Sequence, residues 1–365
     1  MDVSIALLGA GFMGSAHARA YTSIPRLYGS GITPRIAWVV DADAGLAARA
    51  ARDWGAQRWG TDWREAIADP SVSVADVCLP PSLHIDVVTG AAEAGRAIYC
   101  EKPLTTSAAG ALALTELTEA RGLQTMIGFN LRQVPAIRYL RDLISSGRLG
   151  TVHQFAGHFL ADWAADPGVW DWRLSRAAAG PGALADVGSH ILDLARFLLG
   201  DIESACGETS TVVREHHVGD TTRVTDNDDL FVATLRLHSG ALGAISGSRI
   251  ATGRKVEAAV ELTGTAGSAR WNLNRLNELQ LHLEEGDPLE NGFRTVLLGP
   301  DHPLQKPFSP AHGVGISFLD TKVIEAHAFL TCLDSGSMPS PSFRDAWEAA
   351  RLVEQIEASA RVPHR

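Results

Sequence analysis

The chain has 365 residues, of which 45% are hydrophobic and 20% charged, and its formal net charge is −10. This composition is typical of a soluble globular protein, and the length exceeds one ordinary hydrophobic core, so we expect two domains. The negative charge, with no block of Lys or Arg, argues against a nucleic-acid-binding protein, and no apolar run is long enough for a membrane span.

The N-terminal sequence, "DVSIALLGAG", is typical of a strand and predicts no signal peptide. Four cysteines, Cys78, Cys100, Cys206 and Cys332, are far apart and form no CxxC pair. Their spacing fits neither a zinc site nor a disulfide framework. We therefore expect a cytoplasmic protein with reduced thiols and no bound metal.

The first part of the chain alternates short apolar runs with helical stretches. We expect strands at 4–10, 35–41, 73–80, 97–100 and 124–129, and helices at 14–24, 44–55, 82–95 and 107–122. Continuous apolar strands that alternate with helices indicate a doubly wound parallel sheet. Residues 1–129 are therefore predicted to form a Rossmann domain.

The pattern changes over residues 130–365, the predicted second domain. Helices are expected at 134–147 and 182–200, a long strand at 151–161, and a hairpin at 231–250 that turns at Ser239-Gly240. Further strands at 256–263, 267–273 and 278–283 alternate in polarity, which predicts a large, open, mainly antiparallel sheet. Residues 286–313 are expected to be loop. Helices at 314–335 and 342–360 follow, and the second of them could pack on either domain.

A GxGxxG pattern, "GAGFMG", leaves the first predicted strand and begins the first predicted helix. Its glycines are Gly9, Gly11 and Gly14, with Phe12 and Met13 between them. In this context the pattern predicts a turn that lets a pyrophosphate approach the helix N-terminus. The alternative is an ordinary glycine-rich turn.

The second predicted strand ends at Asp41. An acid at this place binds the adenosine ribose hydroxyls and repels a 2′-phosphate, and Asp43 adds another negative charge. We therefore expect NAD as the cofactor in preference to NADP. Alternatively, Asp41 begins the next turn or caps its helix.

The predicted helix at 182–200 carries three unusual polar residues, Asp186, His190 and Asp193, among apolar ones. They stand at i, i+4 and i+7 and therefore share one face. His190 suits a general base, because its ordinary pKa is near neutral. It could instead be a satisfied core histidine, and Asp186 with His190 could be metal ligands, although no third ligand is evident.

The stretch "AIYCEKPL" (97–104) places Glu-Lys-Pro at the end of a predicted Rossmann strand. Together with the later Asp-x-x-x-His helix, it resembles the Gfo/Idh/MocA oxidoreductase family, which includes glucose–fructose oxidoreductase and inositol dehydrogenases. "GAGFMGSAHARAY", "PPSLHIDVV", "GFNLRQVPAIRYLRDLISSGRLG" and "GPGALADVGSHILDLARFLLG" follow the family order over nearly the whole chain. One departure is "PPS" (80–82), where family members often have Asn.

This resemblance implies catalytic roles for Lys102, His190 and Asp186. Lys102 would bind the reacting hydroxyl and stabilise a developing alkoxide, which suits a lysine at the C-terminal edge of a parallel sheet. His190 would take the hydroxyl proton while Asp186 orients the imidazole or binds a neighbouring hydroxyl. Glu101 is expected to orient the strand end, and Pro103 to follow a cis peptide bond.

The resemblance also implies secondary positions. Pro80, His84, Glu101 and Lys102 are expected near the cofactor, where His84 and His17 would pack rather than do chemistry. His158 is also an expected substrate contact, and His153, Asn130 and Arg132 are lesser candidates.

A tryptophan-rich segment, 158–176, precedes the Asp186 helix. It holds Trp163, Trp170 and Trp172 beside Asp162, Asp166 and Arg173. Indole faces suit the C–H faces of sugar rings, and polar groups suit vicinal hydroxyls. Trp163, Trp172 and Arg173 are therefore candidate substrate contacts. Alternatively, the tryptophans fix a loop or an oligomer contact.

The predicted function is an NAD-dependent dehydrogenase that oxidises a secondary hydroxyl of a cyclic polyol, sugar or glycoside. Two alternatives are a redox-neutral enzyme that keeps NAD bound and a non-catalytic sugar-sensing regulator. We also expect a homodimer or homotetramer, because helices are available for one face of the second sheet and an exposed second face would favour association.

Overall fold

A computed structural model describes residues 1–285 and 287–360. The chain forms two compact units. Unit 1 contains Met1–Gln133 and Ser317–Glu348, and unit 2 contains Val134–Ile316 and the chain from Ala349 onward. The return of the chain to unit 1 after residue 316 was not evident from the sequence pattern. Helix α9 (Phe318–Ser335) therefore belongs to unit 1. The terminal helix α10 (Phe343–Ala360) has residues in both units.

Unit 1 is built on a six-stranded parallel sheet, in the order β3-β2-β1-β4-β5-β6. Its strands are β1 (Asp2–Leu8), β2 (Thr33–Val40), β3 (Arg58–Gly60), β4 (Val74–Val77), β5 (Ala97–Cys100) and β6 (Thr125–Ile127). Its helices are α1 (Phe12–Tyr28), α2 (Ala44–Trp54), α3 (Trp63–Ala68), α4 (His84–Glu93), α5 (Ala108–Ala120) and α9, with 3₁₀ turns η1 (Pro81–Leu83) and η2 (Asn130–Gln133). The predicted doubly wound fold is confirmed.

The local sequence explains these elements. Ile5, Ala6, Leu7 and Leu8 of β1 are all fully buried, because helices cover both faces of the sheet. Helices α1, α2 and α9 are neighbours on one side, and α3, α4 and α5 are neighbours on the other. The β-strands therefore end together at one edge, where a parallel sheet binds its ligands.

Unit 2 is built on an eight-stranded sheet in the order β16-β15-β14-β13-β7-β12-β11-β8. Its strands are β7 (Val152–Leu160), β8 (Ile202–Ser210), β11 (Leu230–Leu237), β12 (Leu242–Ser248), β13 (Glu257–Gly264), β14 (Gly267–Asn272), β15 (Glu278–Leu283) and β16 (Arg294–Leu297). All neighbours are antiparallel except β7 and β12. The predicted mainly antiparallel sheet is confirmed.

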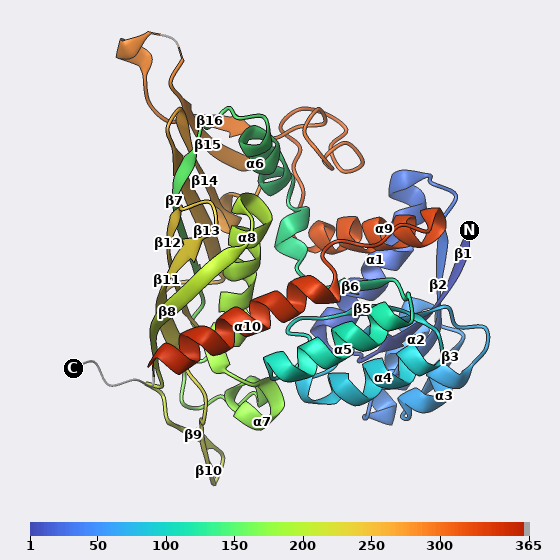
Figure 1. The fold of residues 1–365 in the computed structure, drawn as a ribbon. Coiled ribbons are helices and arrows are strands. Elements are labelled where there is room, and N and C mark those ends of the chain that lie inside the picture. Colours follow the sequence, from blue (N-terminus) through green and yellow to red (C-terminus); the bar gives the residue numbers. More distant parts are fainter. Residues whose placement is uncertain (286, 361–365) are drawn as a thin grey trace. The chain divides into compact units, whose positions relative to one another are not determined.

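Helices α6 (Pro135–Ser145) and α8 (Ser189–Leu199) lie against one face of this sheet (Figure 1). The tight packing shows at Gly157 of β7, where a Cβ atom would lie 2.6 Å from Ile191 of α8. Side chains alternate along β11, so Phe231 is buried on the helix side while Val232 is 53% exposed on the other. Among the described residues no helix covers this second face, which we call the uncovered face.

Several elements were missed. The sequence pattern did not predict β3, α3, β8 or the separate hairpin of β9 (Glu215–Val218) and β10 (Thr221–Val224). Strand β16 and the 3₁₀ turn η6 (Pro288–Glu290) lie within the predicted loop, of which residue 286 lies outside the described residues. Short turns η3 (Trp172–Leu174), α7 (Arg176–Ala179) and η5 (Leu273–Arg275) complete unit 2. The short strands β3, β9 and β10 lack the apolar periodicity that reveals longer ones, and β8 was missed because its nine residues are mostly polar or small.

The predicted helix at 182–200 forms with one difference. It opens as a π-helical segment, η4 (Leu184–Gly188), and continues as α8. No helix in the described part of the chain is long and apolar enough to cross a membrane.

Candidate active site

Glycine is required at the three positions of the GxGxxG turn for different structural reasons. Gly9 has φ 104°, and a Cβ atom there would lie 2.4 Å from the carbonyl oxygen of Cys78. A Cβ atom at Gly14 would lie 2.0 Å from the carbonyl oxygen of Gly9. A Cβ atom at Gly11 would meet no protein atom within 4 Å. Packing therefore explains Gly9 and Gly14, whereas Gly11 keeps open space beside the start of α1, as a bound pyrophosphate requires.

Asp41 lies just beyond β2 and organises the same turn. Its carboxylate accepts hydrogen bonds from the backbone N–H groups of Ala10 (2.9 Å) and Asp43 (3.0 Å). Ionised carboxylates can accept about four hydrogen bonds, so the ribose hydroxyls can still be bound. Asp43, and not Asp41, caps α2, by accepting from the N–H of Leu46. Phe12 and the half-buried Met13 begin α1 beside this acid, and Phe12 is exposed. These residues fit NAD.

His84 is fully buried between two chain segments. Its ring nitrogens lie 2.8 Å from the carbonyl oxygen of Leu79 and 3.0 Å from that of Leu104. Burial lowers the pKa of His84, although the two carbonyl oxygens oppose this shift. His84 therefore joins the end of β4, next to Pro80, to the segment after β5.

Lys102 follows β5 directly and is half-buried, and its bond to Pro103 is cis, as expected. The neighbouring Glu101 carboxylate accepts the backbone N–H of Lys102 itself (3.3 Å). The same carboxylate accepts from Lys322 Nζ of α9 (2.5 Å) and lies 3.1 Å from His17 Nε2 of α1. Lys322 and His17 therefore hold the Glu101 carboxylate, which in turn holds the backbone N–H of Lys102.

These contacts belong to a larger buried group, the Glu101 cluster, which consists of Glu101, His17, Asp76, Lys322 and Glu325. The Nδ1 atom of His17 lies 2.9 Å from Asp76, and Lys322 Nζ donates to Glu325 at 2.8 Å. Tyr21 and Tyr99 donate their hydroxyls to Asp76 and Glu325.

Burial and pairing act in opposite directions on the pKa values of this cluster. Burial alone would raise the pKa of Glu101, but Lys322 and His17 hold it well below its usual range. Burial would lower the pKa of His17, but Asp76 raises it. Burial would likewise lower the pKa of Lys322, but Glu101 and Glu325 raise it. Glu101 is therefore a carboxylate held between two cations.

Metal-ligand residue types also meet here, since His17, Asp76 and Cys78 have candidate ligand atoms within 4.8 Å of one another. The His17–Asp76 and His17–Cys78 separations, 2.9 and 3.5 Å, are those of hydrogen bonds. The same His17 ring is held on its other side by Glu101. The three residues are therefore explained as part of a hydrogen-bonded network.

In unit 2, Asp186 lies in η4 and His190 in the first turn of α8. Between residues 181 and 195 every residue is buried except Asp186, which is half-buried. His190 stacks on Phe159 of β7, with ring centroids 5.7 Å apart. Asp193 is fully buried on the same helix. Because Asp186 lies in a wider π turn, Asp186, His190 and Asp193 do not keep the spacing that would put them on one face of a regular α-helix. π turns of this kind are frequent at functional sites.

The tryptophan-rich segment has two parts. Trp170 packs edge-on against His216 of β9, and the guanidinium of Arg223 of β10 lies 5.3 Å from its ring centre. Trp170 therefore fixes the segment to the β9–β10 hairpin, which agrees with the alternative interpretation that the tryptophans hold a loop in place. Trp172 stacks with the guanidinium of Arg173 (4.2 Å), and both are half-buried. Trp163 is also half-buried.

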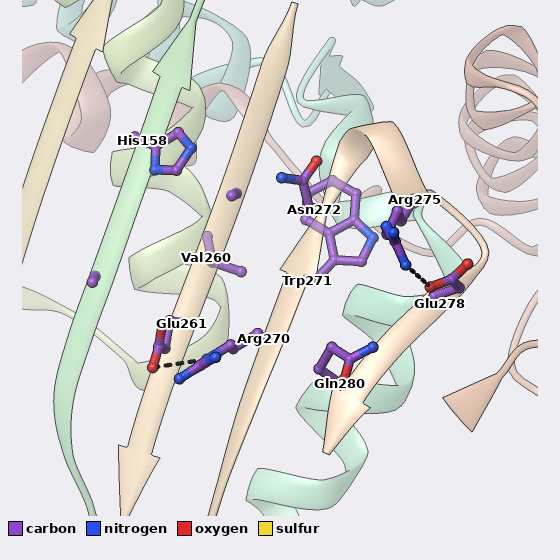
Figure 2. A pocket seen from close by; sticks show the side chains of 11 residues that line it. His158, Val260, Glu261, Arg270, Trp271, Asn272, Arg275, Glu278 and Gln280 are labelled. Carbon is purple, nitrogen blue, oxygen red and sulfur yellow. Dashed lines mark hydrogen bonds and ion pairs between the residues drawn. The ribbon is translucent and has the colours of Figure 1, made fainter. Parts of the chain in front are cut away.

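The structure does not bring His158 together with His190. Phe159 faces α8, so its neighbour His158 points to the opposite, uncovered face. There it lies 3.3 Å from Glu257 and lines a pocket of about 290 Å³ with Asn272 and other residues (Figure 2). The expectation that His158 binds the same substrate as His190 is therefore not supported by its position. His153 is exposed near the start of β7, five residues before His158.

Asn130 and Arg132 are both buried in η2 of unit 1. The Asn130 amide donates to Thr321 (2.8 Å), and the Arg132 guanidinium donates to Asp345 (3.0 Å). Both side chains thus tie η2 to the C-terminal part of unit 1.

Sequence reasoning missed the partners that hold the candidate residues. Lys322 and Glu325 of α9 carried a signal, since "TKVIEAHAF" places charges inside an apolar helix. Asn227, Asp228, Asp229 and Arg249 were also missed, although the run "DNDD" (226–229) before a strand is unusual.

The chain is similar to known proteins over its whole length. The NAD-binding Rossmann-fold model of an oxidoreductase family matches residues 3–129, and the GFO/IDH/MocA C-terminal domain model matches residues 137–270. A levoglucosan dehydrogenase of Pseudarthrobacter phenanthrenivorans is 34% identical and covers 98% of this chain and 96% of its own. An inositol 2-dehydrogenase of Rhizobium meliloti is 27% identical, with 97% and 96% coverage.

Solved structures agree. A levoglucosan dehydrogenase in complex with NADH and levoglucosan superposes with a TM-score of 0.96, at 35% identity, over 99% of this chain and 97% of that one. The predictions of an NAD-binding oxidoreductase and of its fold are thereby confirmed. From its domain models and its relatives, this chain belongs to the Gfo/Idh/MocA oxidoreductase family.

Proposed function

We propose that the protein oxidises a secondary hydroxyl of a cyclic polyol, sugar or glycoside with NAD. The observation that carries this proposal is the Lys102 backbone held by Glu101 at the ligand-binding edge of a Rossmann sheet. Relatives of similar length named levoglucosan and inositol dehydrogenases support the substrate class.

The chemistry divides between a few side chains. When bound, NAD supplies a hydride acceptor. The Lys102 ammonium donates a hydrogen bond to the reacting hydroxyl oxygen and stabilises the negative charge that develops there. His190 accepts the hydroxyl proton, and Asp186 orients its ring or binds a neighbouring hydroxyl. Asp41 selects NAD by binding ribose hydroxyls and repelling a 2′-phosphate.

The substrate is a neutral ring with several hydroxyls. Trp163 and Trp172 offer indole faces, and Arg173 is the one arginine of their segment that we assign to substrate. A carboxylate or phosphate would require a stronger cationic clamp. Levoglucosan and inositols are the first candidates, because the similar dehydrogenases are named for them.

A substrate panel tests this function. Purified protein is mixed with NAD or NADP and with levoglucosan, myo-inositol, scyllo-inositol, glucose, a sugar phosphate or an open-chain 2-hydroxy acid, while NADH absorbance is recorded. We expect turnover of a neutral ring with NAD. Preferred turnover of the acid or phosphate would contradict the proposal, and NAD released only on denaturation would indicate a redox-neutral cycle.

Lys102→Ala should lower kcat by about a hundredfold or more, because one electrostatic stabiliser of the transition state is lost. NADH affinity, measured by fluorescence titration, should stay within about twofold. Lys306→Ala is the matched control, since Lys306 is exposed and outside the site. Near-native turnover of Lys102→Ala would place the chemistry elsewhere.

We further propose a homodimer or homotetramer that forms through the uncovered face, in a cytoplasmic setting that keeps the four free cysteines reduced. The support is the mixture of exposed apolar residues, such as Val232 and Leu242, on that face. Light scattering at micromolar concentration tests the assembly, and a strict monomer would contradict it.

A further inference from the structure

A second buried polar group lies in unit 2, and we call it the Asn227 cluster. It consists of Asn227, Asp228, Asp229 and Arg249, all nearly inaccessible to solvent. Asp229 immediately precedes β11, and Arg249 immediately follows β12, so both belong to the ends of paired strands. Arg249 donates to Asp229 (3.0 Å) and to the side-chain oxygen of Asn227 (2.7 Å). The cluster is thus anchored on the central sheet.

One side of the cluster holds the segment that carries Trp172 and Arg173. The Asn227 amide donates to the carbonyl oxygens of Arg173 (3.0 Å) and Gly180 (3.1 Å). The Arg249 guanidinium donates to the same Arg173 carbonyl at 2.9 Å. The Arg173 carbonyl therefore accepts from two buried donors. These bonds fix the backbone where it leaves Trp172 and Arg173, the two proposed sugar contacts, and enters α7.

The other side holds the opening of the helix that carries Asp186. The Asp228 carboxylate accepts a hydrogen bond from the N–H of Leu184 (2.9 Å). The backbone carbonyl oxygen of Asp228 accepts one from the N–H of Ala183 (2.9 Å). A Cβ atom at Gly182 would lie 1.9 Å from the Asp228 carbonyl oxygen, so the two backbones touch. These bonds satisfy N–H groups at the start of the π-helical segment that would otherwise be unpaired.

We propose that Asn227 and Asp228 are positioning residues that hold the Trp172–Arg173 segment and the Asp186 turn in one fixed relation, and so determine affinity for the sugar. Neither side chain is assigned a contact with substrate. The inference rests on the proposed function, because it takes Trp172, Arg173 and Asp186 as sugar contacts. Misplacement of a positioning group by about 1 Å can cost a hundredfold in rate.

The two links can be cut separately. Asn227→Ala removes both donors to Arg173 and Gly180. Asp228→Ala removes the acceptor for Leu184, whereas Asp228→Asn keeps an acceptor oxygen of the same shape and is its matched control. Leu281→Ala is a second control, because this buried residue of β15 lies near the other edge of the sheet and its loss only destabilises.

The readouts are kcat and KM for levoglucosan and myo-inositol, NADH affinity, melting temperature and amide hydrogen exchange. We expect Asn227→Ala and Asp228→Ala to raise the sugar KM at least tenfold, with NADH affinity changed less than twofold. Exchange should accelerate in both 171–176 and 183–188 for each variant. Asp228→Asn should keep the wild-type sugar KM. Leu281→Ala should lower the melting temperature and leave the sugar KM unchanged.

Each outcome separates the two ideas. An unchanged sugar KM in folded Asn227→Ala and Asp228→Ala overturns the positioning role. So does a KM rise that Leu281→Ala reproduces, since the effect would then be general destabilisation. If the wild-type protein turns over none of the panel, the proposed function fails, and hydrogen exchange still decides whether the cluster links the two segments: acceleration confined to one segment refutes the link.

Discussion

The Glu101 cluster of unit 1 and the Asn227 cluster of unit 2 are both buried and polar, but they are connected differently. In the first, cations and carboxylates pair with one another, and Lys322 and His17 hold Glu101 from separate helices. In the second, most bonds end on backbone atoms of Arg173, Gly180, Leu184 and Val212–Val213. The first cluster pairs opposite charges around one strand end, whereas the second determines the course of two chain segments.

This difference predicts different weaknesses. A cluster of buried ion pairs is destabilised when one charge is removed, because its partner stays buried without a counter-charge. A backbone-holding cluster fails when hydrogen-bond geometry is lost, and it tolerates loss of charge where an acceptor of the same shape remains.

The largest effect should come from Lys322→Met. It removes the cation that the buried Glu101 and Glu325 share and leaves Glu101 paired with His17 alone, at a cost of about 3–5 kcal/mol in the free energy of unfolding. Urea unfolding measures this cost. Lys306→Met removes the same charge from an exposed site and should change stability by less than about 0.5 kcal/mol. Equal effects of the two substitutions would show that Glu101 does not depend on Lys322.

Asp229→Asn should have an intermediate effect. The Asp229 carboxylate accepts from Arg249 with one oxygen and from the N–H groups of Val212 and Val213 (both 2.8 Å) with the other. An amide has one acceptor oxygen, so its NH₂ group must face a donor, which costs about 2–3 kcal/mol. Urea unfolding at pH 7 checks this value, and a stability equal to that of wild type would contradict the geometry.

Asp228→Asn, one residue earlier, should have the smallest effect and a distinct pH dependence. Burial raises the pKa of Asp228 to about 6, although the N–H of Leu184 and the charge of Arg249 oppose this rise and Glu357 adds to it. The folded protein therefore holds this proton more tightly than the unfolded chain, whose aspartates titrate near 3.9. The wild type loses stability from this group as the pH rises from about 4 to 6.

The asparagine variant has no such loss. Its stability relative to the wild type should therefore increase by about 2 kcal/mol across this interval and stay level above it. Melting temperatures of both proteins from pH 4 to 8 test the prediction. Parallel curves would mean that Asp228 is ionised throughout this range.

The same contrast explains how far the sequence could be interpreted. The nucleotide turn was predictable because Gly9, Gly11 and Gly14 lie close together in the sequence, between a predicted strand and a predicted helix. The strand before Glu101 was predictable from its own short apolar run, whereas the cis bond at Pro103 was expected from the family resemblance. The partner of Glu101 was not, because Lys322 is 221 residues away and no local pattern joins them.

The π opening of the Asp186 helix also could not be predicted. Its apolar spacing suits an α-helix, and the bonds that hold the first turn come from Asp228, which follows the next three strands, β8, β9 and β10. The position of His158 was misjudged because which side of β7 the helices cover depends on packing with α8 and not on the strand's own alternation.

The return of the chain to unit 1 has a consequence for protein synthesis. A ribosome releases Glu101 and Asp76 long before Lys322, and all of β7 to β16 is made in between. During this interval the Rossmann strands can pair, but their buried carboxylates lack the α9 cation. Completion of the N-terminal unit therefore waits for the C-terminal part of the chain, and a nascent chain stalled before residue 317 should expose the α9-binding surface to chaperones.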